Sequence, residues 1–199
     1  MLKTLKMISR QEKEKLKVPR SVQDLIPVRT VYPDGIFEVS QGKYSRTYRF
    51  DDINYAVASG PDKDSMFLKY SEILNSLDSG AVSKITVNNR RMDRREIARD
   101  ILLPSRNDRL DEYRKEYNRI LLEKALSTTS MVQDKYLTIS VFKNSIEDAR
   151  TYFARVGAEL QMHFSKLGSR LTELEAEERL KILFDFYRIG EESSFNFDM

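Results

Sequence analysis

The chain has 199 residues, of which 40% are hydrophobic and 33% charged, a balance typical of a folded globular protein and not of a disordered one. Its formal net charge is only +3, so the chain as a whole is not a polyelectrolyte of the kind that binds nucleic acid by charge alone. The absence of cysteine excludes disulfides, thiolate nucleophiles and cysteine-ligated zinc.

Residues 1–17 are predicted to form a flexible basic tail. The first 20 residues hold seven Lys and Arg against two Glu, whereas the rest of the chain is slightly acidic. Leu2, Leu5 and Ile8 lie at helical spacing, which would suit an anionic membrane surface, but three apolar side chains bury little area, so a solvated tail is the preferred interpretation. No apolar run is long enough to span a bilayer and the start lacks a signal-peptide core, so a cytoplasmic chain is expected.

Two strands are predicted next, because Gly35 and Gly42 lie in turns that bracket one apolar run and precede another, KYSRTYRF, at residues 43–50. A period of two in that second run predicts a hairpin with one apolar face. The residues on this face are Tyr44, Arg46, Tyr48 and Phe50.

A helix is predicted from Pro61 to Leu77, because apolar residues recur there at every third or fourth position. Gly80 is expected to cap its carboxyl end. A strand over residues 82–89 follows, so residues 36–89 form a first β-α-β unit.

Arginine dominates the segment that follows, between residues 89 and 107. Its guanidinium group makes bidentate contacts to phosphate and carboxylate, which predicts a docking surface for DNA, lipid or an acidic partner. The alternative is self-neutralisation, because Asp93, Glu96 and Asp100 are interleaved at ion-pair spacing, and this spacing favours the alternative. The candidate partner-binding residues are Arg90, Arg91, Arg94 and Arg95.

A long helix over residues 108–126 carries Leu110, Tyr113, Tyr117 and Ile120 on one stripe. Tyrosines on a helix can stack on nucleic-acid bases, but tyrosine at this spacing more often packs its ring in a core and lets its hydroxyl reach water. Core packing is therefore the preferred interpretation of the stripe.

A second β-α-β unit is predicted at residues 135–174. It consists of a strand over 135–142, a helix over 145–167 with Asn144 and Glu147 as a capping box, and a weaker strand over 169–174. A last helix follows over 176–189, and residues 191–199 are expected to be a loose tail.

Two residues of the helix at 145–167 invite a functional interpretation. Gly157 lies inside it, where glycine is unfavourable, and close packing on the sheet explains this better than a ligand approaching the backbone. His163, the one histidine, lies on the apolar stripe without a nucleophile or second metal ligand to work with, so it is assigned to the core or its boundary.

These elements predict a single α+β domain over residues 18–190, with the helix at 108–126 joining the two units. The expected architecture is a mostly antiparallel sheet of the split β-α-β, ferredoxin-like type with extra helices. That fold hosts many activities and indicates none by itself.

Several segments together resemble one family. They are VPRSVQDLIP, the run from KYSRTYRF through DDINYAVASGPDKD to MFLKYSEILNSL, LDSGAVSKITVNNRR, LDEYRKEYN, VQDKYLTISV, EDARTYFARVGAEL and ERLKILFDFYR with the following GEE. From about Val18 to Phe197 the chain resembles the amino-terminal domain of conjugative type IV secretion ATPases (the VirB, TraC, TrbE and CagE kind) found on bacterial integrative conjugative elements, or conjugative transposons. The resemblance implies a cytoplasmic protein at the inner face of the membrane, which meets inner-membrane components of the conjugation channel and sister subunits, with DNA contact open.

Members of that family continue into a RecA-like motor that uses ATP and Mg²⁺, but this chain lacks the motif. Of its glycines only Gly42 precedes a lysine, and Phe37 and Tyr44 stand where a P-loop requires Gly and Ser or Thr. No catalytic, cofactor-binding or metal-binding residue can therefore be transferred to this chain, and the ATPase domain is expected after residue 199.

The function expected from the resemblance is that of a non-catalytic docking and assembly domain of a DNA-transfer ATPase. The runner-up is a stand-alone nucleic-acid-binding module, because split β-α-β sheets with surface aromatics can stack single-stranded bases.

Overall fold

The structure is a computed structural model of the whole chain. It describes residues 20, 21, 26, 28–91, 99, 101–127, 131–191 and 194–198. The predicted basic tail at residues 1–17 lies outside the described residues.

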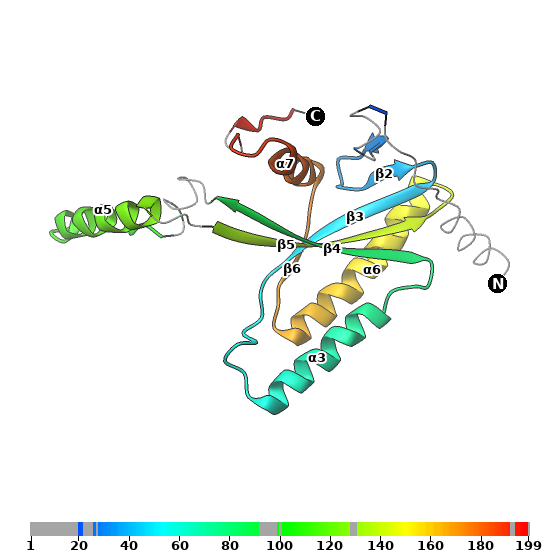
Figure 1. The fold of residues 1–199 in the computed structure, drawn as a ribbon, viewed down its shortest axis with the longest axis horizontal. Coiled ribbons are helices and arrows are strands. Elements are labelled where there is room, and N and C mark those ends of the chain that lie inside the picture. Colours follow the sequence, from blue (N-terminus) through cyan, green and yellow to red (C-terminus); the bar gives the residue numbers. More distant parts are fainter. Residues whose placement is uncertain are drawn as a thin grey trace.

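A six-stranded antiparallel sheet organises the described part of the chain (Figure 1). Its strands are β1 (Thr30–Val31), β2 (Phe37–Ser40), β3 (Lys43–Phe50), β4 (Ala81–Arg91), β5 (Met131–Phe142) and β6 (Leu171–Glu173). Their order is β1-β2-β3-β5-β4, and β6 pairs with β3 beside β2. The predicted hairpin is therefore confirmed as β2 and β3.

Four helices accompany the sheet in the described residues. They are α3 (Gly60–Asn75), α5 (Asp111–Ser127), α6 (Ile146–Leu167) and α7 (Ala176–Tyr187). Figure 1 shows α3 and α6 side by side on one face of the sheet and α7 on the other.

The two β-α-β units interleave, and this makes the fold. In the first unit, β3-α3-β4, the two strands are separated in the sheet by β5; in the second, β5-α6-β6, they are separated by β3. Each unit therefore supplies the strand that fills the gap in the other, which is the split β-α-β arrangement. The α+β fold class predicted from the sequence is confirmed.

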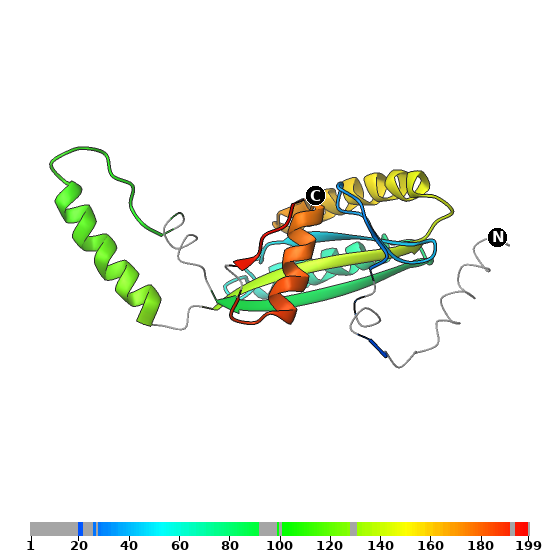
Figure 2. The ribbon, with the colours of Figure 1, turned by 90° about the horizontal axis from the view of Figure 1, so that it is seen from above.

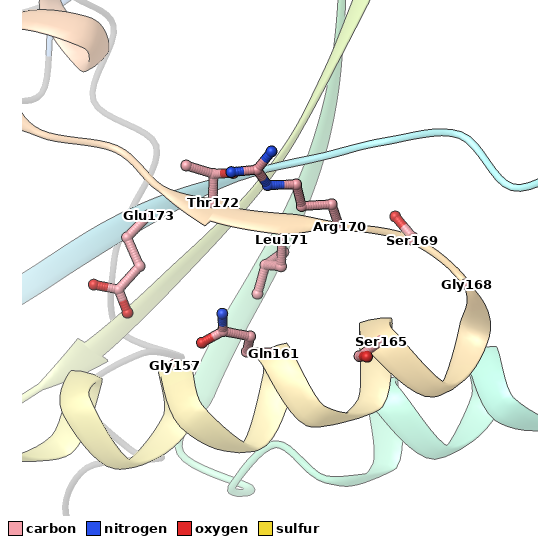
Figure 3. Close-up of a pocket in the computed structure, with 9 residues that line it drawn as sticks. All are labelled: Gly157, Gln161, Ser165, Gly168, Ser169, Arg170, Leu171, Thr172 and Glu173. Atoms are coloured by element: carbon pink, nitrogen blue, oxygen red, sulfur yellow. The ribbon is translucent and has the colours of Figure 1, made fainter.

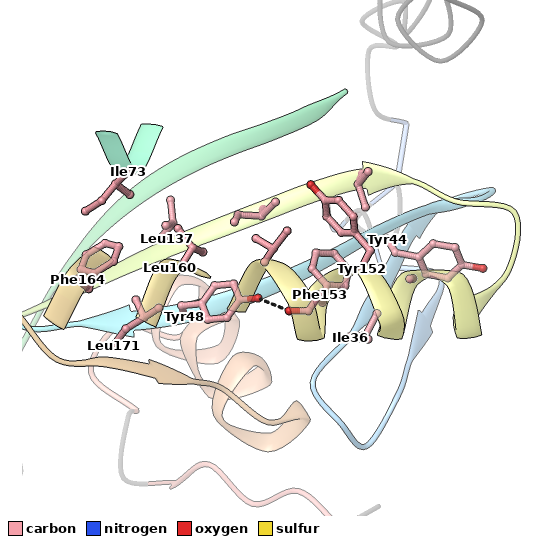
Figure 4. Close-up of a cluster of buried hydrophobic side chains, with 14 of the residues drawn as sticks. Ile36, Tyr44, Tyr48, Ile73, Leu137, Tyr152, Phe153, Leu160, Phe164 and Leu171 are labelled. Atoms are coloured by element: carbon pink, nitrogen blue, oxygen red, sulfur yellow. Dashed lines mark hydrogen bonds between the residues drawn. The ribbon is translucent and has the colours of Figure 1, made fainter. Parts of the chain in front are cut away.

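The core lies between the sheet and the helices α3 and α6 (Figure 4). Tyr48 of β3 is fully buried there, and its hydroxyl donates a 3.5 Å hydrogen bond to the carbonyl of Phe153. Burial raises the pKa of Tyr48, so the hydroxyl stays neutral and can remain a donor. The buried residues that surround it include Ile36, Tyr44, Ile73, Leu137, Ile139, Tyr152, Leu160 and Phe164.

The second face of β3 is buried as well. The period of two correctly placed Tyr44 and Tyr48 in the core, but Ser45 and Thr47 on the other face are also buried, on the α7 side of the sheet. The prediction of a single covered face was incomplete, because a helix that follows 130 residues later in the chain, α7, supplies the second layer.

Two helix ends differ from the predictions, because a serine caps the helix in each case. Helix α3 ends at Asn75 with Ser76 as its cap, so Gly80 is not the cap. At the start of α6, the Ser145 side chain accepts a 3.1 Å hydrogen bond from the amide of Asp148, so the predicted capping box of Asn144 and Glu147 is wrong. A serine oxygen immediately before the helix reaches this amide directly.

Gly157 lets α6 approach β6 closely. A Cβ at this position would lie 2.4 Å from Oε1 of Glu173, whose carboxylate forms a 2.5 Å ion pair with Arg46 of β3. Side chains of the sheet, those of Glu173 and Tyr48, therefore lie beside the place that a side chain here would occupy, as the packing explanation requires.

Gly157→Ala is expected to lower the free energy of unfolding by about 1 kcal/mol, because displacing the Glu173 carboxylate from the half-buried Arg46 outweighs the gain in helix propensity. In a Glu173→Ala background the same change should instead stabilise the protein, by about 0.5 kcal/mol, because only the propensity gain remains. Urea denaturation of the four variants in this double-mutant cycle measures both values. The same sign in both backgrounds would contradict the argument.

Candidate docking surface

Helix α5 lies beyond one end of the sheet and away from the core (Figures 1 and 2). It is inserted between β4 and β5, which pair with each other along their whole described length from Ala81 opposite Val141 to Arg91 opposite Met131. The helix that was predicted to join the two units is confirmed in position, although it begins at Asp111 and not at residue 108.

A cluster of hydrogen bonds around Asp111 fixes the start of α5. The carboxylate of Asp111 accepts hydrogen bonds from the Ser105 hydroxyl at 2.5 Å and from the amides of Arg106 at 3.1 Å and Asn107 at 2.8 Å, and it also pairs with Arg114. These bonds, led by that from Ser105, hold the pKa of Asp111 well below its usual value. The loop before α5 is therefore folded onto the first turn of the helix.

Two turns after Asp111, the amide side chain of Asn118 also bonds to the preceding loop. The Asn118 side chain accepts from the amide of Leu103 and donates to its carbonyl, each at 2.9 Å. The side of α5 that contacts its own chain is therefore the one carrying Asp111, Arg114 and Asn118, and the half-buried Leu122 and Ala125 continue it at helical spacing.

The apolar stripe of α5 faces outward as a result. Its side chains expose between 45% and 73% of their surface, so the prediction that this stripe packs in the core is wrong. Helical spacing tells which residues share a stripe but not what covers them. The residues of this stripe, which we call the α5 stripe, are Leu110, Tyr113, Tyr117 and Ile120.

Of the candidate arginines, Arg90 and Arg91 lie at the end of β4 that precedes α5 in the chain. Arg90 of β4 forms a 2.6 Å ion pair with Asp134 of β5, and both side chains are largely buried. Arg91 is the last residue of β4, whereas Arg94 and Arg95 lie outside the described residues. Arg90 is thus neutralised by a residue of the neighbouring strand. The predicted neutralisation by Asp93, Glu96 and Asp100 stays a prediction, because these three residues lie outside the described residues.

Charges of both signs line a hollow of about 360 Å³ beside this ion pair. Arg49, Arg90, Arg99 and Lys135 meet Asp51, Asp52 and Asp134 there. The ammonium group of Lys135 lies 2.6 Å from the Asp52 carboxylate. Because the charges are nearly balanced, the hollow offers no strong field to a polyanion.

A second hollow, of about 650 Å³, lies between α6 and β6 (Figure 3). Successive turns of α6 contribute Gly157, Gln161 and Ser165, and the opposite wall is the chain from Gly168 to Glu173. Its side chains offer amide and hydroxyl groups, the guanidinium group of Arg170 and one carboxylate that is already paired with Arg46. His163 is half-buried and does not line this hollow. The groups suit hydrogen bonding to a ligand but do not form a nucleophile with its base.

Two further searches cover only the described residues. No group of three or more His, Asp or Glu in them is placed to hold a metal ion. No helix among them is long and apolar enough to cross a membrane.

Comparisons with known proteins leave the family open. No protein-family model matches the chain, and no curated protein matches it. The family resemblance described above therefore stays a prediction that rests on the quoted segments.

Proposed function

We propose that this chain is a non-catalytic docking and assembly domain of a conjugative type IV secretion ATPase, and that α5 is the element through which it docks. The ATP and Mg²⁺ chemistry would belong to the motor domain of the parent protein. The domain would lie in the cytoplasm, peripherally at the inner face of the membrane. There it would bind inner-membrane components of the conjugation channel and sister subunits.

The observation that carries the proposal is the α5 stripe. Tyr113 exposes 73% of its surface and Tyr117 52%, on a helix whose other side is bonded to its own preceding loop through Asp111 and Asn118. Exposed aromatic residues on one helix face are typical anchors of protein–protein interfaces. A helix that presents them away from the sheet is suited to insert into a groove of a partner.

Replacing both tyrosines with serine is expected to reduce conjugative transfer at least tenfold, because losing two aromatic anchors costs about 2 kcal/mol or more of binding each. The double variant Tyr113→Ser, Tyr117→Ser would be introduced into the parent ATPase and transfer counted between donor and recipient cells. The matched control is Glu112→Ser, Lys115→Ser, which changes two exposed polar residues of the same helix. Transfer at the control's level, with equal amounts of protein in the cell, would refute docking through the stripe.

A nucleic-acid-binding module is the second candidate, and the exposure of Tyr113 and Tyr117 is the observation in its favour. Tyrosines one turn apart could stack on successive bases. Against it, α5 is neutral, with four acidic and four basic residues, and Arg119 is bound to Glu116 and Glu123.

We expect no tight binding of a single-stranded oligonucleotide to the chain, because a neutral helix releases few counterions on meeting phosphates. Fluorescence anisotropy at 50 to 300 mM salt measures this. Submicromolar affinity that falls steeply with salt, and that is lost in Tyr113→Ser, Tyr117→Ser, would replace the docking proposal with the nucleic-acid one.

A further inference from the structure

Strand β4 forms a long unpaired edge of the sheet (Figure 2). It pairs with β5 over all eleven of its residues without a bulge, and no other strand in the described part of the chain pairs with its outer side. Exposed edges in soluble proteins are usually short or interrupted by proline or a bulge. Here the residues from Ala81 to Asn89 include no proline and a single charge, Lys84.

Exposed apolar side chains lie along this edge. Val82, Ile85 and Val87 of β4 each expose 45% to 50% of their surface. On the α7 side of the sheet, the exposed Phe186 and Tyr187 line the same hollow, of about 520 Å³, as the middle of β4. A strand edge to which no described strand is added, with apolar side chains beside it, is the surface that a further strand would complete.

The opposite side of the edge has an apolar recess too. Ile85 lines a cavity of about 200 Å³ together with Tyr70 and Leu74 of α3, both partly exposed. A strand added to β4 would therefore meet apolar surface on both faces of the sheet.

The geometry points to a second copy of this chain as the occupant: β4 pairs antiparallel with β4 of a sister subunit about a two-fold axis at Thr86. This inference deepens the assembly role proposed above by naming the surface that sister subunits share. Thr86 is the midpoint of the strand, so this register alone pairs all eleven residues. A two-fold interface uses the same patch on both subunits, which β4 supplies by itself.

The side chains in the middle of β4, from Lys84 to Asn88, are compatible with themselves in this register. Ile85 of one copy lies opposite Val87 of the other, twice, on the α3 face, and Thr86 meets Thr86 on the axis. Lys84 lies opposite the neutral Asn88. Moving the register by one pair in either direction costs paired residues at the strand ends, and moving the centre to Val87 sets Lys84 opposite Arg90. Like charges directly opposite each other are destabilising, so the shifted register centred on Val87 is disfavoured.

Cysteine cross-linking tests both the interface and its register, because the natural chain has no cysteine. Under mild oxidation, Thr86→Cys is expected to form a disulfide dimer, since residues opposite each other in an antiparallel pair have Cα atoms about 4.5 to 5.5 Å apart, within disulfide reach. Asn88→Cys serves as the matched control on the same strand face. Its two Cα atoms would be about 13 Å apart along the ladder and should give at least tenfold less dimer.

Mixing two different cysteine variants tests the register further. Lys84→Cys and Asn88→Cys chains, each poorly cross-linked alone, should form a mixed disulfide when combined, because these positions are opposite each other across the axis. Sedimentation of the unmodified chain should show a concentration-dependent dimer. A monomer at all concentrations up to about 100 μM, or a dimer in which Asn88→Cys cross-links as readily as Thr86→Cys, would overturn the proposal.

The outcome is separable from that of the docking proposal. The variant Tyr113→Ser, Tyr117→Ser leaves β4 unchanged, so in a Thr86→Cys background it should keep the full disulfide yield even if transfer is lost. Loss of the disulfide in that variant would mean that α5, and not β4, joins the two copies.

Discussion

Arg179→Met is expected to lower the free energy of unfolding by about 3 kcal/mol, because it leaves buried acceptors without a donor. Arg179 of α7 is buried, and its guanidinium group donates to the carbonyls of Gly35 at 2.7 Å and Ser45 at 2.8 Å and to the Ser45 hydroxyl at 3.0 Å. It also stacks 3.9 Å above the ring of Phe37. These contacts attach α7 to the sheet, so the variant should loosen that whole layer.

The buried charge itself offsets part of this stabilisation. Burial, assisted by the nearby Arg46, lowers the pKa of Arg179 to about 9, which still leaves the group charged at neutral pH. Removing the cation also removes its desolvation cost, and for this reason the expected loss is smaller than the sum of three charged hydrogen bonds.

Urea denaturation at pH 7 measures the change, with Arg188→Met as its control. Arg188 caps the other end of α7, exposes most of its side chain and pairs with Glu191 at 3.5 Å, so its replacement should cost no more than about 0.5 kcal/mol. If Arg179→Met were as stable as the natural chain, the carbonyls of Gly35 and Ser45 would have found other donors and the anchoring role would be wrong.

The importance of Arg179 was not foreseen from the sequence, although a signal was present. In α7, Ala176, Arg179, Ile182 and Leu183 are among the residues that turn toward the sheet. Arg179 lies three residues after Ala176 and four before Leu183, at core spacing. A charged residue is almost never fully buried, and spacing alone does not outweigh that expectation.

The sequence predicted well what depends on neighbouring residues. Periods of two and of three to four located the strands and helices of both β-α-β units, and α6 ends at Leu167, the predicted residue, with Gly168 at a φ of +85° as its cap. Predicting the order of the strands required one further assumption, that each β-α-β unit is of the split type, with a strand of the other unit between its own two. What covers a stripe depends on segments distant in the chain, and for this reason the α5 stripe and the second face of β3 were misjudged.

The predicted loose tail illustrates the same limit. Phe195 packs edge-to-face against Phe184 of α7, with ring centroids 5.4 Å apart, so this part of residues 191–199 folds back onto the domain. Two phenylalanines among polar residues carry no helical or strand signal, and the contact with the ring of Phe184 can be seen only in the fold. Part of the expected tail therefore belongs to the folded unit.

Gly35→Ala is expected to destabilise the protein by about 3 kcal/mol or more, because two costs add at one position. Gly35 has a φ of +78°, which side chains other than glycine's rarely adopt, and an added Cβ would lie 2.0 Å from the carbonyl oxygen of Leu174. Since that oxygen belongs to the backbone between β6 and α7, it cannot rotate away as a side chain could. The turn before β2 would have to shift.

Gly168→Ala separates the two costs. Gly168 has a similar φ of +85°, but nothing lies within 4 Å of an added Cβ, so this variant should lose only about 1 kcal/mol through backbone strain. Equal losses in the two variants, measured by urea denaturation, would show that the turn yields without cost.

Because the Gly35 carbonyl is also an acceptor for Arg179, Gly35→Ala combined with Arg179→Met should cost less than the sum of the single changes. Strict additivity would mean that the turn and α7 are held independently, whereas a shortfall of about 1 kcal/mol would show that one contact joins the amino-terminal hairpin to the last helix.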